Sequence, residues 1–263
     1  MAKTRLDTLL LERGLFPSRS RAAAAVMAGQ VHLGAARRRA DKPGQLVAED
    51  EPVAVKEAPA YVSRGGVKLA NALDAFEIEP AGRHCLDVGA STGGFTDCLL
   101  KRRAAHVVAL DVGYGKLDWT LRNDPRVTVL ERVNARSLEP SLLPYRPDLI
   151  VADVSFISLT KGLGAVLSAA GERFDCLALV KPQFEVGRGR VGKGGVVRSG
   201  AERRAALVAV GAWARGGGHS VLGYTSSGLP GPAGNRESFV WISGPGRSGD
   251  LADLEAAARR VEP

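Results

Sequence analysis

The sequence is short of the residues that build several common kinds of functional site. Its three cysteines, Cys85, Cys98 and Cys176, lie inside apolar segments and show no metal-ligand spacing, so we expect buried, reduced thiols and no metal site. No apolar run approaches the roughly 18 residues of a transmembrane helix. Charged residues interrupt the leucines of the N-terminus, MAKTRLDTLLLERG, which is therefore no signal peptide. These absences predict a cytoplasmic protein without a membrane span, which we expect to be a monomer.

Positive charge, by contrast, is in excess and unevenly distributed. The chain has 36 lysines and arginines against 28 acidic residues, with a hydrophobic fraction of 45% that is ordinary for a globular protein. Residues 1–42 carry nine basic and three acidic side chains, and residues 186–204 carry six and one. Two such patches suggest a polyanion as partner, most often nucleic acid, although a solvated basic surface has the same composition.

The first 58 residues predict a small α+β domain. Leucine spacing indicates a helix over residues 4–14, and an alanine-rich segment after a serine cap indicates a second helix that stops at Gly29. Short strands are expected at residues 30–34 and 51–57, with a basic turn between them.

The stretch RLDTLLLERGLFPSRSRAAAAVMAGQVHLG resembles the S4 RNA-binding domain. The resemblance implies that the second helix and the turn after it face structured RNA, with arginines on the phosphate backbone. A helical scaffold with a solvated face is the alternative. The RNA-binding residues expected in this domain are Arg5, Arg19, Arg21, Arg37, Arg38 and Arg39.

After a linker at residues 59–63, strands alternate with helices over residues 64–263. This alternation predicts an α/β domain with a parallel sheet that is covered on both faces. Strands are expected at 84–88, 106–112, 127–132, 149–154, 176–181, 219–225 and 238–243, and helices at 63–78, 94–102, 158–170, 199–215 and 251–263.

The segment HCLDVGASTGGFTDCLL predicts a nucleotide pocket, because a glycine-rich turn between a strand and a helix lets a ligand approach the backbone. Asp111 ends the next strand, where a carboxylate accepts hydrogen bonds from ribose hydroxyls. This pattern fits NAD and S-adenosylmethionine, and mere packing is also open. Ser91 breaks the regular glycine pattern and Asn134 lies where a methyltransferase contacts adenine, so we favour S-adenosylmethionine. The expected cofactor residues are Asp87, Gly89, Ser91, Thr92, Gly93, Gly94, Phe95, Asp111, Val112, Asn134 and Asp153.

Four charged residues from separate segments are expected to meet at this pocket. Asp153 and Lys181 stand at the ends of buried strands, and Lys68 lies near the start of the helix before the first strand. Glu237 begins the last strand, and joins them if that strand runs antiparallel to the others. Ligands of open parallel sheets bind beyond the carboxyl ends of the strands, which is where all four would lie. A structural ion pair is the alternative for any one of them.

The set Lys68, Asp153, Lys181 and Glu237 matches the Lys-Asp-Lys-Glu tetrad of FtsJ-like ribose 2′-O-methyltransferases. With the N-terminal domain, the chain from about residue 4 to residue 243 resembles the TlyA family, historically called hemolysins. The stretches VSRGGVKL, DVGASTGGFTDCLL, ADVSFISL and VKPQFEVGRGRVGKGGVVR carry the resemblance. In the linker, Pro59-Ala60-Tyr61 replaces the Arg-Ala-Trp of some members, which puts any coupling role of the linker in doubt.

The resemblance implies a seven-stranded, Rossmann-like methyltransferase sheet that uses S-adenosylmethionine without a metal. Its implied substrate is a cytidine 2′-hydroxyl in 23S, and also 16S, ribosomal RNA within the ribosomal subunits. In the implied mechanism neutral Lys181 removes the hydroxyl proton, Asp153 holds Lys181, and Lys68 and Glu237 orient the hydroxyl. The glycine-rich loop after Lys181 would close over the target nucleotide, with Arg188, Arg190 and Lys193 as further RNA contacts.

Three alternative functions remain, and each is disfavoured by the sequence. Base methylation is disfavoured, because the fourth strand ends in ADVSF without the usual prolines and no cysteine stands at a nucleophile position. A membrane-active hemolysin lacks a signal peptide and a span. An RNA-binding assembly protein without catalysis would not need the tetrad. Because aromatic residues make up only 5% of the chain, we expect folded RNA to be recognised by its shape.

Overall fold

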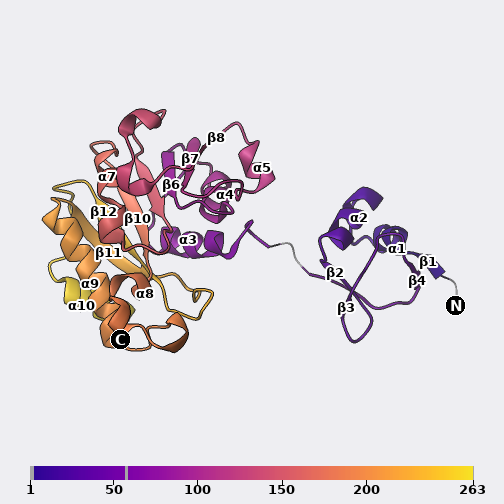
Figure 1. Ribbon diagram of the computed structural model, residues 1–263. Helices are drawn as coiled ribbons and strands as arrows, with labels where there is room; N and C mark the ends of the chain where they lie inside the picture. The colour runs from indigo at the N-terminus through magenta and orange to yellow at the C-terminus, as the bar shows by residue number, and fades with distance from the viewer. Residues whose placement is uncertain (1–2, 57–58, 263) are drawn as a thin grey trace. The chain divides into compact units, whose positions relative to one another are not determined.

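The computed structural model describes residues 3–56 and 59–262, apart from the Arg188 side chain. Contacts within the chain divide it into two units, Met1–Pro59 and Ala60–Pro263 (Figure 1). No helix in the described ranges is long and apolar enough to cross a membrane.

The N-terminal unit packs two helices on short strands. Its elements are β1 (Lys3–Arg5), α1 (Leu6–Glu12), α2 (Arg19–Met27), β2 (Val31–Leu33), β3 (Arg38–Arg39), β4 (Leu46–Ala48) and β5 (Val53–Val55). β2 pairs with β3 and β5, and β1 pairs with β4. Leu6, Leu10, Val26 and Val31 lie in its apolar core. Both predicted helices are present, and the first begins at Leu6 because the residues before it pair as a strand; residue 57 of the predicted strand lies outside the described residues.

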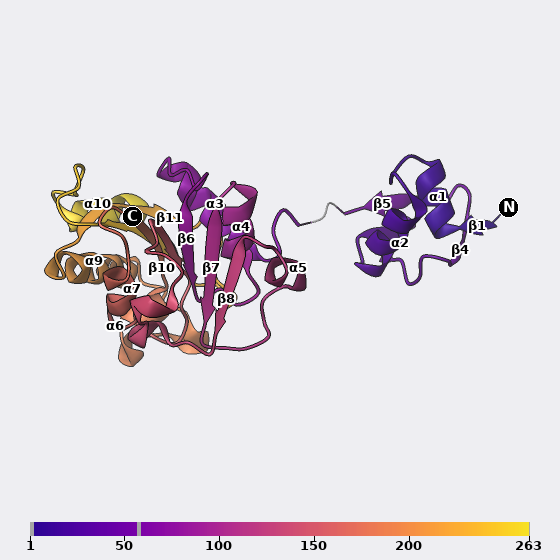
Figure 2. The ribbon, with the colours of Figure 1, turned by 90° about the horizontal axis from the view of Figure 1, so that it is seen from above.

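The C-terminal unit is built on a seven-stranded sheet, which confirms the predicted fold class (Figure 2). The strand order is β11-β12-β10-β9-β6-β7-β8, and β12 alone runs against the others. The strands are β6 (His84–Val88), β7 (His106–Asp111), β8 (Val127–Glu131), β9 (Leu149–Ala152), β10 (Asp175–Val180), β11 (Ser220–Ser226) and β12 (Ser238–Ser243).

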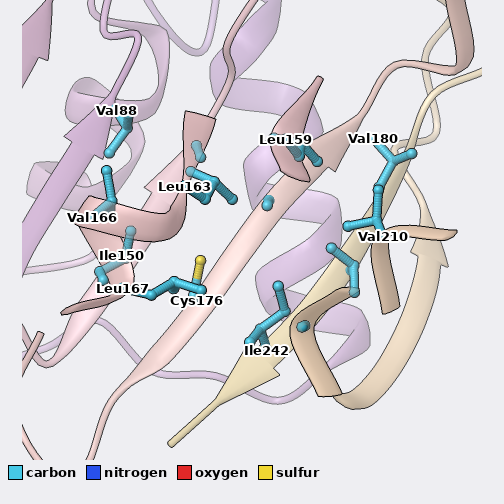
Figure 3. Packing of buried hydrophobic residues seen from close by; sticks show 14 of the residues in the cluster. Val88, Ile150, Leu159, Leu163, Val166, Leu167, Cys176, Val180, Val210 and Ile242 are labelled. Atoms are coloured by element: carbon cyan, nitrogen blue, oxygen red, sulfur yellow. The ribbon is translucent and has the colours of Figure 1, made fainter. Parts of the chain in front are cut away.

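Helices cover both faces of this sheet. One face packs against α3 (Arg64–Ala75), α4 (Gly94–Lys101) and α5 (Trp119–Arg122). The other packs against α6 (Leu159–Gly162), α7 (Gly164–Ser168), α9 (Gly200–Gly216) and α10 (Leu254–Val261), as Figure 3 shows for Ile150, Cys176 and Ile242. Successive residues of a strand point to opposite faces, so apolar side chains on both faces require the continuous apolar runs that the sequence has.

The three cysteines are buried, free thiols divided between the two faces of the sheet. Cys176 packs on the α9 face, and Cys85 and Cys98 pack on the α3 face. Burial raises the pKa of Cys98 to about 11 and that of Cys176 to about 12, so both thiols stay protonated.

Several short elements differ from the predicted boundaries. The helix predicted over residues 158–170 is two short helices, α6 and α7, which meet at Leu163 between two glycines of low helix propensity. The short helices α5 and α8 (Pro182–Glu185) were not predicted, nor were the 3-10 turns at Ala135–Ser137, Pro140–Leu142, Arg188–Arg190 and Lys193–Gly195. Single turns of this kind depend on tertiary contacts and leave no periodic pattern.

Candidate active site

The register of the central sheet aligns its strand ends at one edge. β6 pairs with β9 so that Val88 lies opposite Ala152, and β10 pairs with β12 so that Val180 lies opposite Ser238. The residues immediately beyond these pairs are Gly89, Asp153, Lys181 and Glu237. The edge of the sheet therefore carries one turn glycine and three of the four predicted catalytic residues.

The predicted tetrad forms two ion pairs. Lys181 Nζ lies 2.5 Å from Asp153 Oδ1, and it also donates a hydrogen bond of 2.8 Å to Ser155 Oγ. Lys68 Nζ lies 2.5 Å from Glu237 Oε2, and these two side chains are only 9% and 1% exposed. A buried ammonium and a buried carboxylate are each costly alone, so the Lys68–Glu237 pair must be kept intact.

All four residues line one cleft of about 400 Å³. Ser63, Arg64 and Gly65 at the start of α3 line the same cleft, and so does Pro232. β6 contributes Asp87 to the cleft, the glycine-rich turn after it contributes Gly89, Ser91 and Thr92, and the start of α4 contributes Gly94 and Phe95. The structure thus brings the predicted catalytic residues and much of the predicted cofactor turn to one place.

A second cleft of about 320 Å³ contains most of the remaining predicted cofactor residues. It is lined by Asp111, Val112 and Asn134, and shares Gly89, Ser91 and Asp153 with the first cleft. Gly93 lines neither cleft: its φ is +92°, and a Cβ there would lie 2.3 Å from the Leu121 side chain. The absence of a side chain at Gly93 therefore leaves room for Leu121.

Backbone amides fix the Asp111 carboxylate. Ser91 N donates to Asp111 Oδ2 at 2.8 Å, and Gly113 N donates to Oδ1 at 2.6 Å. Ser91 itself has a φ of +48°, so the turn holds a non-glycine residue in the left-handed region. Asn134 Oδ1 accepts from Arg136 N at 3.1 Å, which leaves its amide NH₂ available to a ligand.

Asp87 is buried, and one of its carboxylate oxygens is unpaired within the described residues. Thr96 donates to Oδ2 through its backbone N (2.9 Å) and its Oγ1 (2.6 Å), while Oδ1 has no hydrogen-bond partner. Burial raises the pKa of Asp87 to about 7, and the nearby Asp153 carboxylate also raises it. A buried carboxylate with a free oxygen at a cleft is suited to a cationic ligand group.

The segment 227–236 approaches Glu237 and is held by hydrogen bonds from α3. Asn71 Nδ2 donates to Ser227 O at 2.9 Å, and Arg64 Nη2 donates to Pro230 O at 2.5 Å. Gly231 approaches so closely that a Cβ there would lie 2.3 Å from Glu237 Oε1. The close fit excludes any larger residue at position 231 without displacing Glu237.

Buried Asn235 joins this segment to the glycine-rich loop 187–198. Its Oδ1 accepts from Val197 N at 2.9 Å, and its Nδ2 donates to Gly195 O at 2.8 Å. Asn235 was not predicted, because nothing in the residues around it shows that it lies inside the fold.

The linker residues before α3 are held on α4. Val62 N donates to Asp97 Oδ2 at 2.9 Å, and Lys101 Nζ donates to Asp97 Oδ2 at 2.9 Å and to Ala60 O at 2.7 Å. The Lys101 ammonium also lies 5.2 Å from the centroid of the Tyr61 ring. Since α4 begins at the glycine-rich turn, the linker is fixed to the helix that forms the cleft.

Phe156 is a second residue that the sequence analysis missed. It lines the second cleft, is 92% exposed, and has a φ of +68°, which is unfavourable for a bulky residue. Its ring centroid lies 5.6 Å from that of Phe184. The sequence places an aromatic residue three positions after Asp153, but it does not show that the ring faces solvent.

The predicted RNA-binding residues are surface residues where their side chains are described. Arg5, Arg19, Arg21 and Arg37–Arg39 are exposed on the N-terminal unit. In the C-terminal unit Lys193 is exposed and Arg190 pairs with Glu202 at 3.2 Å. The Arg188 side chain lies outside the described part of the structure. Among the described residues, no group of three or more histidine, cysteine or acidic side chains is arranged to hold a metal ion.

Comparison with known proteins gives consistent matches. The model of the FtsJ-like methyltransferases matches residues 61–243. The chain is 51% identical to the 16S/23S rRNA (cytidine-2′-O)-methyltransferase TlyA of Mycobacterium tuberculosis, over 91% of this chain and 90% of that protein. It is 40% identical to Hemolysin A of Brachyspira hyodysenteriae, over 74% and 80% of the two chains. A solved structure from Streptococcus thermophilus that carries a hemolysin name has a TM-score of 0.74 at 38% identity, covering 99% of this chain and 96% of that one.

The buried Asp87 predicts a pH dependence of stability in the ligand-free protein. Its pKa is about 7 when folded, against an ordinary value of 3.8, so the folded state binds a proton that the unfolded state releases between these values. Stability should therefore fall as pH rises from about 4 to about 7 through this group. Denaturant midpoints across pH 5–8 should show an advantage of Asp87→Asn over the parent that grows with pH. The exposed Glu172→Gln is the control, and parallel curves for Asp87→Asn and the parent would contradict the prediction.

Proposed function

Because the chain belongs to the FtsJ-like methyltransferase family and to its TlyA branch, we propose that it methylates the 2′-hydroxyl of a cytidine in ribosomal RNA. The proposed methyl donor is S-adenosylmethionine, and the proposed target is large-subunit RNA, with small-subunit RNA as a second. The observation that carries the proposal is the convergence of Lys68, Asp153, Lys181 and Glu237 on one cleft beside the glycine-rich turn. Action on ribosomal RNA also implies that the protein works in the cytoplasm.

The residues of the two clefts fit the donor. Asp111, fixed by two backbone amides, offers its remaining lone pairs to ribose hydroxyls, and Asn134 offers its amide to the adenine edge. The unpaired Asp87 oxygen can accept from the ammonium of the methionine part. When bound, S-adenosylmethionine supplies a methyl group activated by a sulfonium centre.

The tetrad then prepares the hydroxyl. A ribose hydroxyl is a weak nucleophile until its proton leaves, and Lys181 Nζ in its neutral form is the acceptor for that proton. Asp153 holds Lys181 in place, and afterwards stabilises the ammonium that forms. The buried Lys68–Glu237 pair offers a donor and an acceptor that orient the hydroxyl towards the methyl group.

The proposed base for the reaction gives the first test. Lys181→Ala should lower methyl transfer by about 100-fold or more, the range expected for loss of a general base, while cofactor and RNA affinities change only a few-fold. Transfer is measured with radiolabelled S-adenosylmethionine on deproteinised ribosomal RNA, and nucleoside mass spectrometry locates the methyl group. The exposed Lys161→Ala is the matched control. Undiminished turnover would refute the role of Lys181, and a methyl group on a base would refute the ribose assignment.

The N-terminal unit is proposed to provide most of the RNA affinity. A chain that begins at Ala60 keeps the contacts of Ala60 and Val62 with α4, so it should fold and bind S-adenosylmethionine. It should lose most of its affinity for ribosomal RNA. The affinity of the full chain should fall steeply with salt, because bound cations are released from the phosphates. Filter binding at two salt concentrations measures both effects, and equal RNA affinity of the two chains would overturn the proposal.

Exposed Phe156 is proposed to stack on the base of the target nucleotide once that nucleotide has flipped out of the RNA helix. Phe156→Gly should not lower the denaturant midpoint, since glycine adopts a φ of +68° without strain. The same change should lower kcat/KM for RNA about tenfold, the effect of losing one stacked base. Phe156→Trp is the matched variant, which should retain activity. Wild-type kcat/KM in the glycine variant would argue against stacking.

A further inference from the structure

The N-terminal unit buries a carboxylate beneath two exposed arginines. Asp7 in the first turn of α1 is 4% exposed. Arg5 makes a bidentate contact with its carboxylate: Nε donates to Oδ1 at 3.1 Å and Nη2 donates to Oδ2 at 2.8 Å. Arg19 Nη2 reaches the same Oδ2 at 3.3 Å. The two arginine side chains are 52% and 55% exposed, so each guanidinium has one side on Asp7 and another open to solvent.

These contacts fix the direction of both guanidinium groups. A two-pronged contact with a carboxylate defines the plane of a guanidinium, which a single contact does not. Arg5 is also confined from a second side, because a Cβ on Gly44 would lie 2.9 Å from its Nη2. The Arg5 hydrogen bonds hold the pKa of Asp7 well below its usual range, so the carboxylate is charged at neutral pH.

The same arginines stand in a region of concentrated positive charge. Arg19 is the first residue of α2, whose first turn contains no acidic residue, and Ser18 caps the helix by accepting from Arg21 N at 3.2 Å. The N-terminal end of a helix carries partial positive charge, which adds to that of Arg19 and Arg21. Asp7 removes one unit of positive charge from this surface. If the surface needed only charge to attract RNA, Asp7 would be a disadvantage.

We propose that Asp7 is a positioning residue for RNA recognition, which holds Arg5 and Arg19 in the orientation that the phosphates of the folded target require. The inference rests on the proposed RNA role of the N-terminal unit. The two arginine side chains are then already ordered in the folded protein, so RNA binding does not lose the conformational entropy of ordering them. An RNA without the matching phosphate geometry gains no affinity from this order, and it binds a surface that is less positive than it would be without Asp7. Asp7 therefore increases discrimination between RNAs at the expense of affinity for RNA in general.

The test compares two variants of the full chain with the same change of charge. Asp7→Asn and Asp41→Asn each remove one negative charge and so raise the net charge of the N-terminal unit by one. Asp41, however, is exposed and contacts neither arginine. Dissociation constants are measured by filter binding at one salt concentration for deproteinised 23S ribosomal RNA and for poly(U). Asp41→Asn should strengthen the binding of both RNAs slightly and to the same extent. Asp7→Asn should weaken 23S binding about tenfold, the usual effect of one specific arginine contact, without weakening poly(U) binding. If Asp7→Asn tightens both RNAs as Asp41→Asn does, the inference is wrong.

Further variants separate this inference from folding and from the proposed function. Arg5→Lys keeps the charge and leaves Asp7 paired with Arg19, yet cannot make the two-pronged contact, so it should also reduce discrimination. If thermal melting shows that Asp7→Asn unfolds the unit, Arg5→Lys decides: retained discrimination then refutes the inference. When Arg5→Ala and Arg19→Ala are combined, adding Asp7→Asn should no longer weaken 23S binding. If Arg5→Ala and Arg19→Ala leave 23S binding unchanged, the RNA role of the unit is refuted. If they weaken 23S binding but Asp7→Asn has no effect on it, the positioning role alone is refuted.

Discussion

The hydrogen-bond register of the central sheet is the constraint on which the rest of the site depends. Because β12 runs against its neighbours, the residue before its first position lies at the same edge as the residues after β9 and β10. Glu237 thereby meets the cleft that contains Asp153 and Lys181. A one-residue slip of β12 would turn its apolar side chains to the wrong faces, so the packing of both cores maintains the position of Glu237.

The loops around the cleft are secured to this edge by the buried side chain of Asn235 and the exposed side chain of Arg64. Asn235 links the segment that approaches Glu237 to the glycine-rich basic loop, and Arg64 links the same segment to α3. A displacement of the basic loop would therefore be transmitted to Asn235, the residue two positions before Glu237. In the N-terminal unit, Asp7 likewise orders exposed residues from within.

Patterns of residue type were sufficient to predict the seven strands and the convergence of the tetrad, because buried strands require continuous apolar runs and charged residues at their ends stand out. The pattern did not predict α5, α8 or the break between α6 and α7, which are single turns stabilised by tertiary contacts. The packing of Leu121 against Gly93 could not be predicted either, because the two residues belong to segments that only the fold brings together. Asp7, Asn235 and Phe156 became apparent only with the structure, because their importance depends on burial or exposure that neighbouring residues do not determine.

The division of the thiols between the two faces of the sheet has a consequence for how the protein's motions can be observed. Cys176 lies in β10 under one helical layer and Cys85 lies in β6 under the other, whereas Cys98 belongs to α4 of that second layer. The N-terminal unit has no cysteine. A thiol reagent reaches a buried cysteine only while the layer above it is open. The labelling rates of Cys176 and Cys85 would therefore report separately on how often each helical layer opens, without any engineered probe.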